Sequence, residues 1–214
     1  MSRTIKVIGK AKTSCPPNSI TVTLTLEAAD RGYQKTLDLA AEKLEKVQKA
    51  AAAADFENKE LKTSSFSVTD EYEYVQTETN GNKRQFIGYK CCHRLGLEFD
   101  MDMKRLGNIL AALSESEADA EFHISFGVKD IDLLKKQLMA QAVRDAAEKA
   151  EILAKAAGVK LKEIAAISCG EFDENIASPT HFEQGYSLLR AMPADITPED
   201  VDADVSVNVE WEIE

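Results

Sequence analysis

Residues 66–99 read FSVTDEYEYVQTETNGNKRQFIGYKCCHRLGLEF, and this stretch decides the fold. Apolar and polar side chains alternate on both sides of its centre, as in β-strands with one buried face. Asn80-Gly81, between the two runs, tolerates the positive φ of a tight hairpin turn. A two-residue turn there predicts that Tyr74 lies opposite Ile87, so that the apolar side chains share one face of a sheet. Moving the turn by one residue, to Gly81-Asn82, still places the apolar side chains of both strands on the same face of the sheet.

The same patterns identify the other elements. Alternation predicts further strands over residues 20–28, 122–128 and 205–213. Apolar residues at helical spacing predict three helices, over about residues 37–54, 103–113 and 130–157. Asp102 is placed to cap the start of the second helix, and Gly158 to end the third in a left-handed conformation.

The predicted order along the chain is β-β-α-β-β-α-β-α-β, a long loop and a last strand, which indicates an α+β fold. We expect a largely antiparallel sheet with two long helices and one short helix packed on one face. A single domain over residues 1–214 is expected, with a loose strand–helix–strand repeat. Residues from about 171 to 200 hold three prolines and many acidic residues, and are predicted to be a loop. Loops of that length usually carry function, bind partners or move.

Charge excludes one class of partner. The chain has 37 acidic and 26 basic residues, a formal net charge of −11, which repels a nucleic-acid backbone. No apolar run of about 18 residues and no signal peptide is present, so we expect no membrane insertion and a cytoplasmic location. The four cysteines match no disulfide framework and fit free thiols in a reducing compartment.

Cys91-Cys92-His93 is the strongest candidate for chemistry, because thiolates and imidazole bind zinc. Successive strand side chains point to opposite faces, so Cys92 is separated from Cys91 and His93. We therefore favour a hydrogen-bonded core histidine over a metal or nucleophilic site. A redox-sensing thiol at Cys91 or Cys92 is an alternative that needs exposure and a low pKa. The chain has no nucleophile elbow, P-loop or dinucleotide fingerprint, and no cofactor is predicted.

Aromatic and aliphatic residues in two places are candidates for an interface. The hairpin tyrosines are expected to pack within the sheet, and contact with another molecule is the alternative. Apolar residues inside a long polar loop must be buried against the protein itself or a neighbour. The candidate interface residues are Tyr72, Tyr74, Phe182, Tyr186, Leu188 and Leu189.

Short motifs recur in a characteristic order along nearly the whole chain. They include Val7-Ile8-Gly9, Phe86-Ile87-Gly88-Tyr89, Phe126-Gly127-Val128-Lys129-Asp130 and Met192-Pro193. Their order and spacing resemble the SIMPL-domain family, a bacterial domain of unknown function. The early turn departs from the family pattern, with Pro16-Pro17-Asn18 where relatives have a Pro-Asp turn.

The resemblance implies an α+β fold, a tendency to form oligomers and a loose link to stress responses and signalling. It implies no catalytic residue, and many relatives carry an export signal that this chain lacks. We therefore expect a homo-oligomeric, non-enzymatic binding or scaffold module. One alternative is a small-molecule sensor or enzyme with a site beneath residues 171–200, holding Cys169 or His181. The other is the thiol redox sensor.

Overall fold

The computed structural model describes residues 3–76, 82–170, 172, 176–184 and 196–214. The elements are β1 (Thr4–Cys15), β2 (Ser19–Asp30), α1 (Tyr33–Ala53), β3 (Leu61–Gln76), β4 (Asn82–Asp100), α2 (Met103–Glu115), β5 (Ala120–Gly127), α3 (Ile131–Ala157), β6 (Leu161–Cys169), β7 (Ala177–Gln184) and β8 (Val201–Ile213). The predicted order is confirmed with one addition, because β7 lies inside the stretch predicted to be a loop. Pro179 argued for a loop, yet β7 is an edge strand, where a missing amide donor is tolerated.

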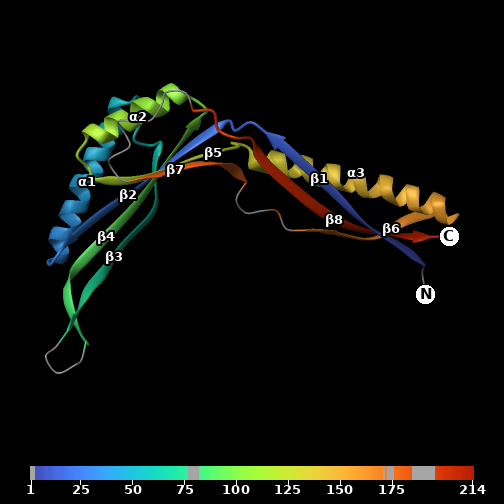
Figure 1. The fold of residues 1–214 in the computed structure, drawn as a ribbon, viewed down its shortest axis with the longest axis horizontal. Coiled ribbons are helices and arrows are strands. Elements are labelled where there is room, and N and C mark those ends of the chain that lie inside the picture. The colour runs from blue at the N-terminus through green and yellow to red at the C-terminus, as the bar shows by residue number, and fades with distance from the viewer. Residues whose placement is uncertain (1–2, 77–81, 171, 173–175, 185–195) are drawn as a thin grey trace. The chain divides into compact units, whose positions relative to one another are not determined.

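The strands form two antiparallel sheets (Figure 1). One has the order β1-β8-β6, and the other has the order β3-β4-β2-β5-β7. The α+β class is confirmed, but the sequence pointed to one sheet, since alternation shows that a face is buried without showing which strand lies alongside. Contacts divide the chain into a first unit of residues 1–18, 127–179 and 198–214 and a second unit of residues 19–126 and 180–197. The expectation of a single domain stays a prediction.

In the first unit, α3 packs along β1 and β8. The buried stripe of α3 advances in steps of four: Leu138, Ala142, Ala146, Ala150 and Ala154. These small side chains allow close packing, and a Cβ added to Gly9 of β1 would lie 2.0 Å from the Ala142 carbonyl oxygen. The helical spacing of apolar residues also predicts Leu153 on this stripe, but Leu153 is 48% exposed. The buried stripe continues in steps of four to Ala154 and so winds gradually around the helix. Gly158 ends α3 at φ 68°, as predicted. No helix in the described part of the chain is long and apolar enough to cross a membrane.

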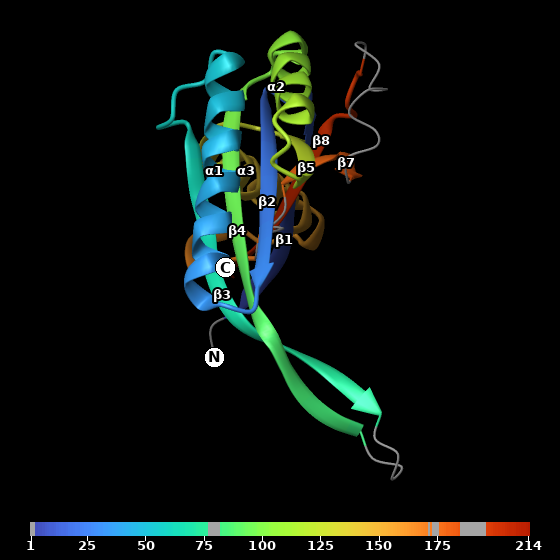
Figure 2. The same ribbon diagram turned by 90° about the vertical axis from the view of Figure 1, so that its left-hand side faces the viewer.

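In the second unit, α1 packs on β2 and β4, and α2 packs beside α1 (Figure 2). Ile20, Val22, Leu24 and Leu26 of β2 are almost fully buried beneath the helices. As predicted, Asp102 caps α2, and its Oδ1 accepts the backbone N–H groups of Lys104 and Arg105 at 2.9 and 3.0 Å. The helices therefore cover the middle of the sheet.

The hairpin of β3 and β4 is present, but its predicted register is wrong. Tyr74 lies opposite Arg84 rather than Ile87, and Tyr72 lies opposite Phe86. The register differs because β3 ends at Gln76 and β4 begins at residue 82, which leaves more than two residues between the strands. A bulge that leaves Ile87 without a partner shifts the pairing again.

Gly88 adjoins this bulge, at φ 155°. A Cβ there would lie 2.5 Å from the Asp30 carbonyl oxygen, so glycine allows β4 to pass close to the end of β2. Pairing of β2 with β4 reaches no further than Tyr89. Beyond that residue the hairpin is a two-stranded ribbon that extends past β2 (Figure 2).

Candidate functional site

A row of aromatic rings runs from the start of α1 onto the two-stranded part of the hairpin. Ring centroids are 5.4 Å apart for Tyr33 and Tyr89, 5.2 Å for Tyr89 and Phe86, and 5.7 Å for Phe86 and Tyr72. All three contacts are edge-to-face, the favourable geometry for aromatic pairs. The Arg84 guanidinium lies 3.7 Å from the Tyr72 ring centroid, a cation–π distance. These rings stabilise a ribbon that two strands alone would support only weakly.

Beside this row, the helix-facing side of β3 is uncovered. Phe66, Val68, Tyr72 and Tyr74 lie on this side, and we call them the β3 shelf. Phe66 is 52% exposed and Tyr74 70% exposed, because α1 packs mainly on β2 and β4. Val68 is half-buried against the cluster of Ala28, Ala40 and Cys91. Tyr72 makes the predicted packing within the sheet, against Phe86, but Tyr74 does not. Asp70 lies between Val68 and Tyr72 on the same side, so the shelf is a largely apolar strip with one carboxylate, at the edge of the helix layer.

Cys91 and Cys92 lie on opposite faces of β4, as the strand pattern predicted. Cys91 is fully buried among small side chains, and burial raises the pKa of its thiol. A raised pKa keeps the thiol protonated and unreactive, which counts against Cys91 as a redox sensor. Cys92 is half-buried on the other face.

His93 is a core histidine, as predicted. It is buried, a ring nitrogen lies 2.9 Å from the Thr63 hydroxyl, and its ring meets that of Phe66 edge-to-face at 5.1 Å. Burial lowers the pKa of His93, so the neutral ring is favoured. Among the residues that the structure describes, no three His, Cys, Asp or Glu side chains come together as a metal site.

The candidates from the predicted loop have separate locations. Phe182 is half-buried and packs edge-to-face on Phe126 with centroids 6.2 Å apart, so it is part of the second unit's core. Tyr186, Leu188 and Leu189 lie outside the described residues. His181 is exposed, and its ring lies 5.9 Å from that of His123. Cys169 is an exposed residue of the first unit, and the site expected beneath residues 171–200 stays a prediction.

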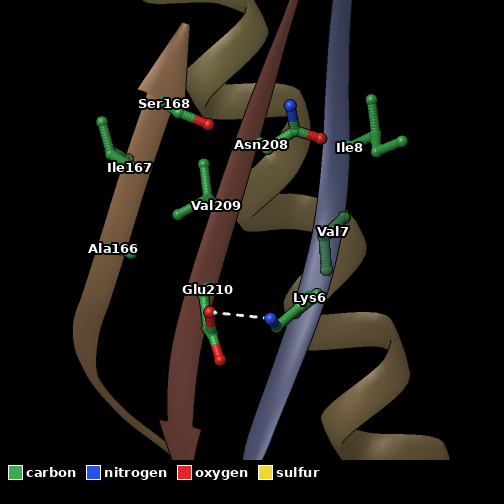
Figure 3. Close-up of a pocket in the computed structure, with 9 residues that line it drawn as sticks. All are labelled: Lys6, Val7, Ile8, Ala166, Ile167, Ser168, Asn208, Val209 and Glu210. Carbon is green, nitrogen blue, oxygen red and sulfur yellow. Dashed lines mark ion pairs between the residues drawn. The ribbon is translucent and has the colours of Figure 1, made fainter.

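The three-stranded sheet has a hollow of about 510 Å³ that the sequence analysis missed (Figure 3). Residues 6–8 of β1, 166–168 of β6 and 208–210 of β8 line it. Lys6 and Glu210 form an ion pair of 3.2 Å at one end of it, and Ser168 and Asn208 lie towards the other end (Figure 3). The signal in the sequence was that alternate residues of β1 include lysines and alternate residues of β8 include acids, which could have indicated charge pairs across the sheet. The polar groups of the lining are therefore an ammonium, a carboxylate, a hydroxyl and an amide.

The family comparison covers both units. A family model described as SIMPL, a protein of unknown function (DUF541), matches residues 5–211. The match begins in β1 and ends in β8, so it includes the β3 shelf and the hollow. A search of curated proteins finds no match. The resemblance of the sequence motifs is confirmed, and the chain belongs to the SIMPL family.

Proposed function

We propose that this SIMPL protein is a non-enzymatic binding module that associates with copies of itself. The observation that carries the proposal is the β3 shelf, where the apolar side of an edge strand lies beside the helix layer without cover. A cytoplasmic location and a part in a bacterial stress response belong to the same proposal.

The composition of the shelf supports an interface. Single exposed apolar side chains are normal, but several in one strip at a sheet edge suggest a contact surface. Phe66, Tyr72 and Tyr74 are aromatic, and the Arg84 guanidinium lies against Tyr72. Aromatic residues and arginine are the types enriched where proteins meet. The polar groups of the hollow and the buried, neutral His93 supply no paired nucleophile and base, which favours binding over catalysis.

Sedimentation over a range of protein concentrations tests the proposal. We expect the wild-type mass to correspond to more than one chain, and Phe66→Ser and Tyr74→Ser to lower it. Ile152→Ser on α3 is the matched control, because Ile152 is 67% exposed and belongs to the other unit. A single-chain mass at every concentration would overturn the proposal.

A further inference from the structure

We propose that β3 pairs antiparallel with β3 of a second copy about a two-fold axis at Ser67, which joins two five-stranded sheets into one. This inference rests on the proposed self-association and names the strand, the register and the partner. Its first basis is a comparison of the sheet edges. An edge strand presents unpaired N–H and C=O groups, and proteins usually block such edges against other chains.

The outer edge of β1 is blocked by α3. Asp145 accepts the backbone N–H of Lys10 at 2.7 Å, and the Lys149 ammonium donates to the Ile8 carbonyl at 3.3 Å. Asp145 and Lys149 also form an ion pair with each other. Two side chains therefore satisfy backbone groups that another strand would need.

The edge strands β7 and β6 are also protected against pairing with another chain. β7 carries Pro179, which removes a donor, and β6 has only nine residues with two register irregularities. In contrast, β3 has 16 residues and borders the uncovered shelf. Among the described edge strands, β3 is the longest and the one that carries the shelf, and its own register shifts lie towards its two ends, at Thr63/Ser65 and Glu71/Tyr72.

The second basis is the match of β3 with itself. Residues directly opposite across an antiparallel pair lie on the same face of the sheet. With the axis at Ser67, Phe66 lies opposite the partner's Val68, both on the shelf side. Ser64 is an extra residue in β3, since Thr63 and Ser65 pair with the adjacent residues Leu95 and Arg94.

Beyond this bulge the register shifts by one. Glu71 then lies opposite the partner's Lys62 on the open face, and Tyr72 lies opposite the partner's Leu61 on the shelf side. The two-fold axis makes each pair occur twice. Lysine therefore meets glutamate, apolar side chains meet apolar side chains, and Asp70 meets the partner's Thr63, a polar residue, on the shelf side.

Neighbouring registers fit less well. Moving the axis to Phe66 sets Asp70 opposite the partner's Leu61, and moving it to Val68 sets Asp70 opposite the partner's Phe66. Either shift places a carboxylate against an apolar side chain. The register about Ser67 avoids this cost, so charge and burial select it.

A charge-reversal experiment tests the register. Lys62→Glu sets one glutamate opposite the partner's Glu71 at each of the two places, and Glu71→Lys likewise sets lysine opposite lysine. Each variant alone should therefore associate about tenfold more weakly. The double variant restores attraction. A mixture of the two single variants also restores it, because the two different chains then pair with opposite charges at both places. Glu151→Lys on α3 is the control for net charge, since Glu151 is exposed and lies in the other unit.

Sedimentation equilibrium at low salt distinguishes the outcomes. Weaker single variants with recovery in both the mixture and the double variant support the register. If the wild type assembles and the single variants assemble equally well, or recovery fails, the β3 register is overturned and the proposed function stands. If the wild type stays a single chain, both are overturned.

Discussion

Replacing Gly9 by alanine is the sharpest test of how the first unit is packed. Gly9 lies in β1 directly against α3, in the stripe of small residues that covers the sheet. A Cβ there would meet the Ala142 carbonyl oxygen at 2.0 Å and the Ala146 Cβ at 2.7 Å. The nearest obstacle is helix backbone, so no rotation of a side chain relieves the clash.

The size of the effect follows from these distances. An ordinary contact begins at about 3.4 Å, so α3 must move about 3.4 − 2.0 = 1.4 Å away from β1. Such a shift stretches the contacts of Asp145 and Lys149 with the β1 edge and opens gaps around Ala142. Overpacking of a well-packed core costs about 1–3 kcal/mol, and a clash with backbone belongs at the upper end. We expect Gly9→Ala to lower the free energy of unfolding by about 3 kcal/mol.

Trp211 provides the assay. It is the chain's one tryptophan and is buried in β8, so its fluorescence reports the first unit in a urea titration. Gly107→Ala in α2 is the matched control, because a Cβ there meets nothing within 4 Å. Alanine in a helix interior should stabilise the second unit by about 0.5–1 kcal/mol, measured by circular dichroism. Unchanged Trp211 unfolding in Gly9→Ala would refute the close packing of β1 on α3.

Three further predictions concern the buried histidine, the carboxylate at the β1 edge and the cysteine thiols. As the pH is lowered below about 6.5, the wild-type free energy of unfolding should decrease by at most about 1.4 kcal/mol per pH unit, because unfolded His93 binds a proton that the buried ring resists. In urea titrations from pH 5 to 8, His93→Leu should lack this pH dependence. Lys149, through its side chain, and the Lys10 amide hold the pKa of Asp145 below its ordinary value. Its stabilising effect is thus full above pH 3.8 and lost as pH falls further. Asp145→Ala should therefore lower the Trp211 unfolding midpoint at pH 7, and its difference from the wild type should shrink as the pH falls below 3.8. Cys169 should react with a thiol reagent in the folded protein within seconds, whereas Cys91 should react only on unfolding; fast labelling of Cys91 would contradict its burial.

Local patterns predicted the local structure well. The order of helices and strands, the Asp102 cap and the Gly158 end depend on neighbours within a few residues, and the structure confirms them. His93 was correctly placed in the core because its parity along the strand matched the apolar row. In each case the deciding interactions lie within the segment itself or on one face of it.

Features that depend on distant partners were less predictable. The hairpin register failed because the connection is longer than two residues, and alternation cannot count the residues in a turn; the bulge at Ile87 then shifts the later pairs. The exposure of the β3 shelf follows from the lateral position of α1, which no pattern within β3 encodes. Tyr33 was missed for the same reason, since it joins the aromatic row only when the start of α1 lies beside Tyr89.

The uncovered surfaces of the two units differ in chemistry: one carries paired charges and the other exposed aromatic side chains. On the three-stranded sheet, Lys6 pairs with Glu210 and Lys12 with Asp202, at 3.2 and 3.1 Å, so charged groups there have partners within the same unit. Exposed ion pairs of this kind contribute little and are screened by salt. The β3 shelf is mostly apolar, and its aromatic side chains stay exposed within a single chain. Salt should therefore separate the two contributions to self-association: the difference between the Lys62→Glu variant and the wild type should shrink at high ionic strength, while wild-type assembly through the apolar shelf should persist. Loss of wild-type assembly in salt would instead mean that charge, not the burial of aromatic rings, holds the copies together.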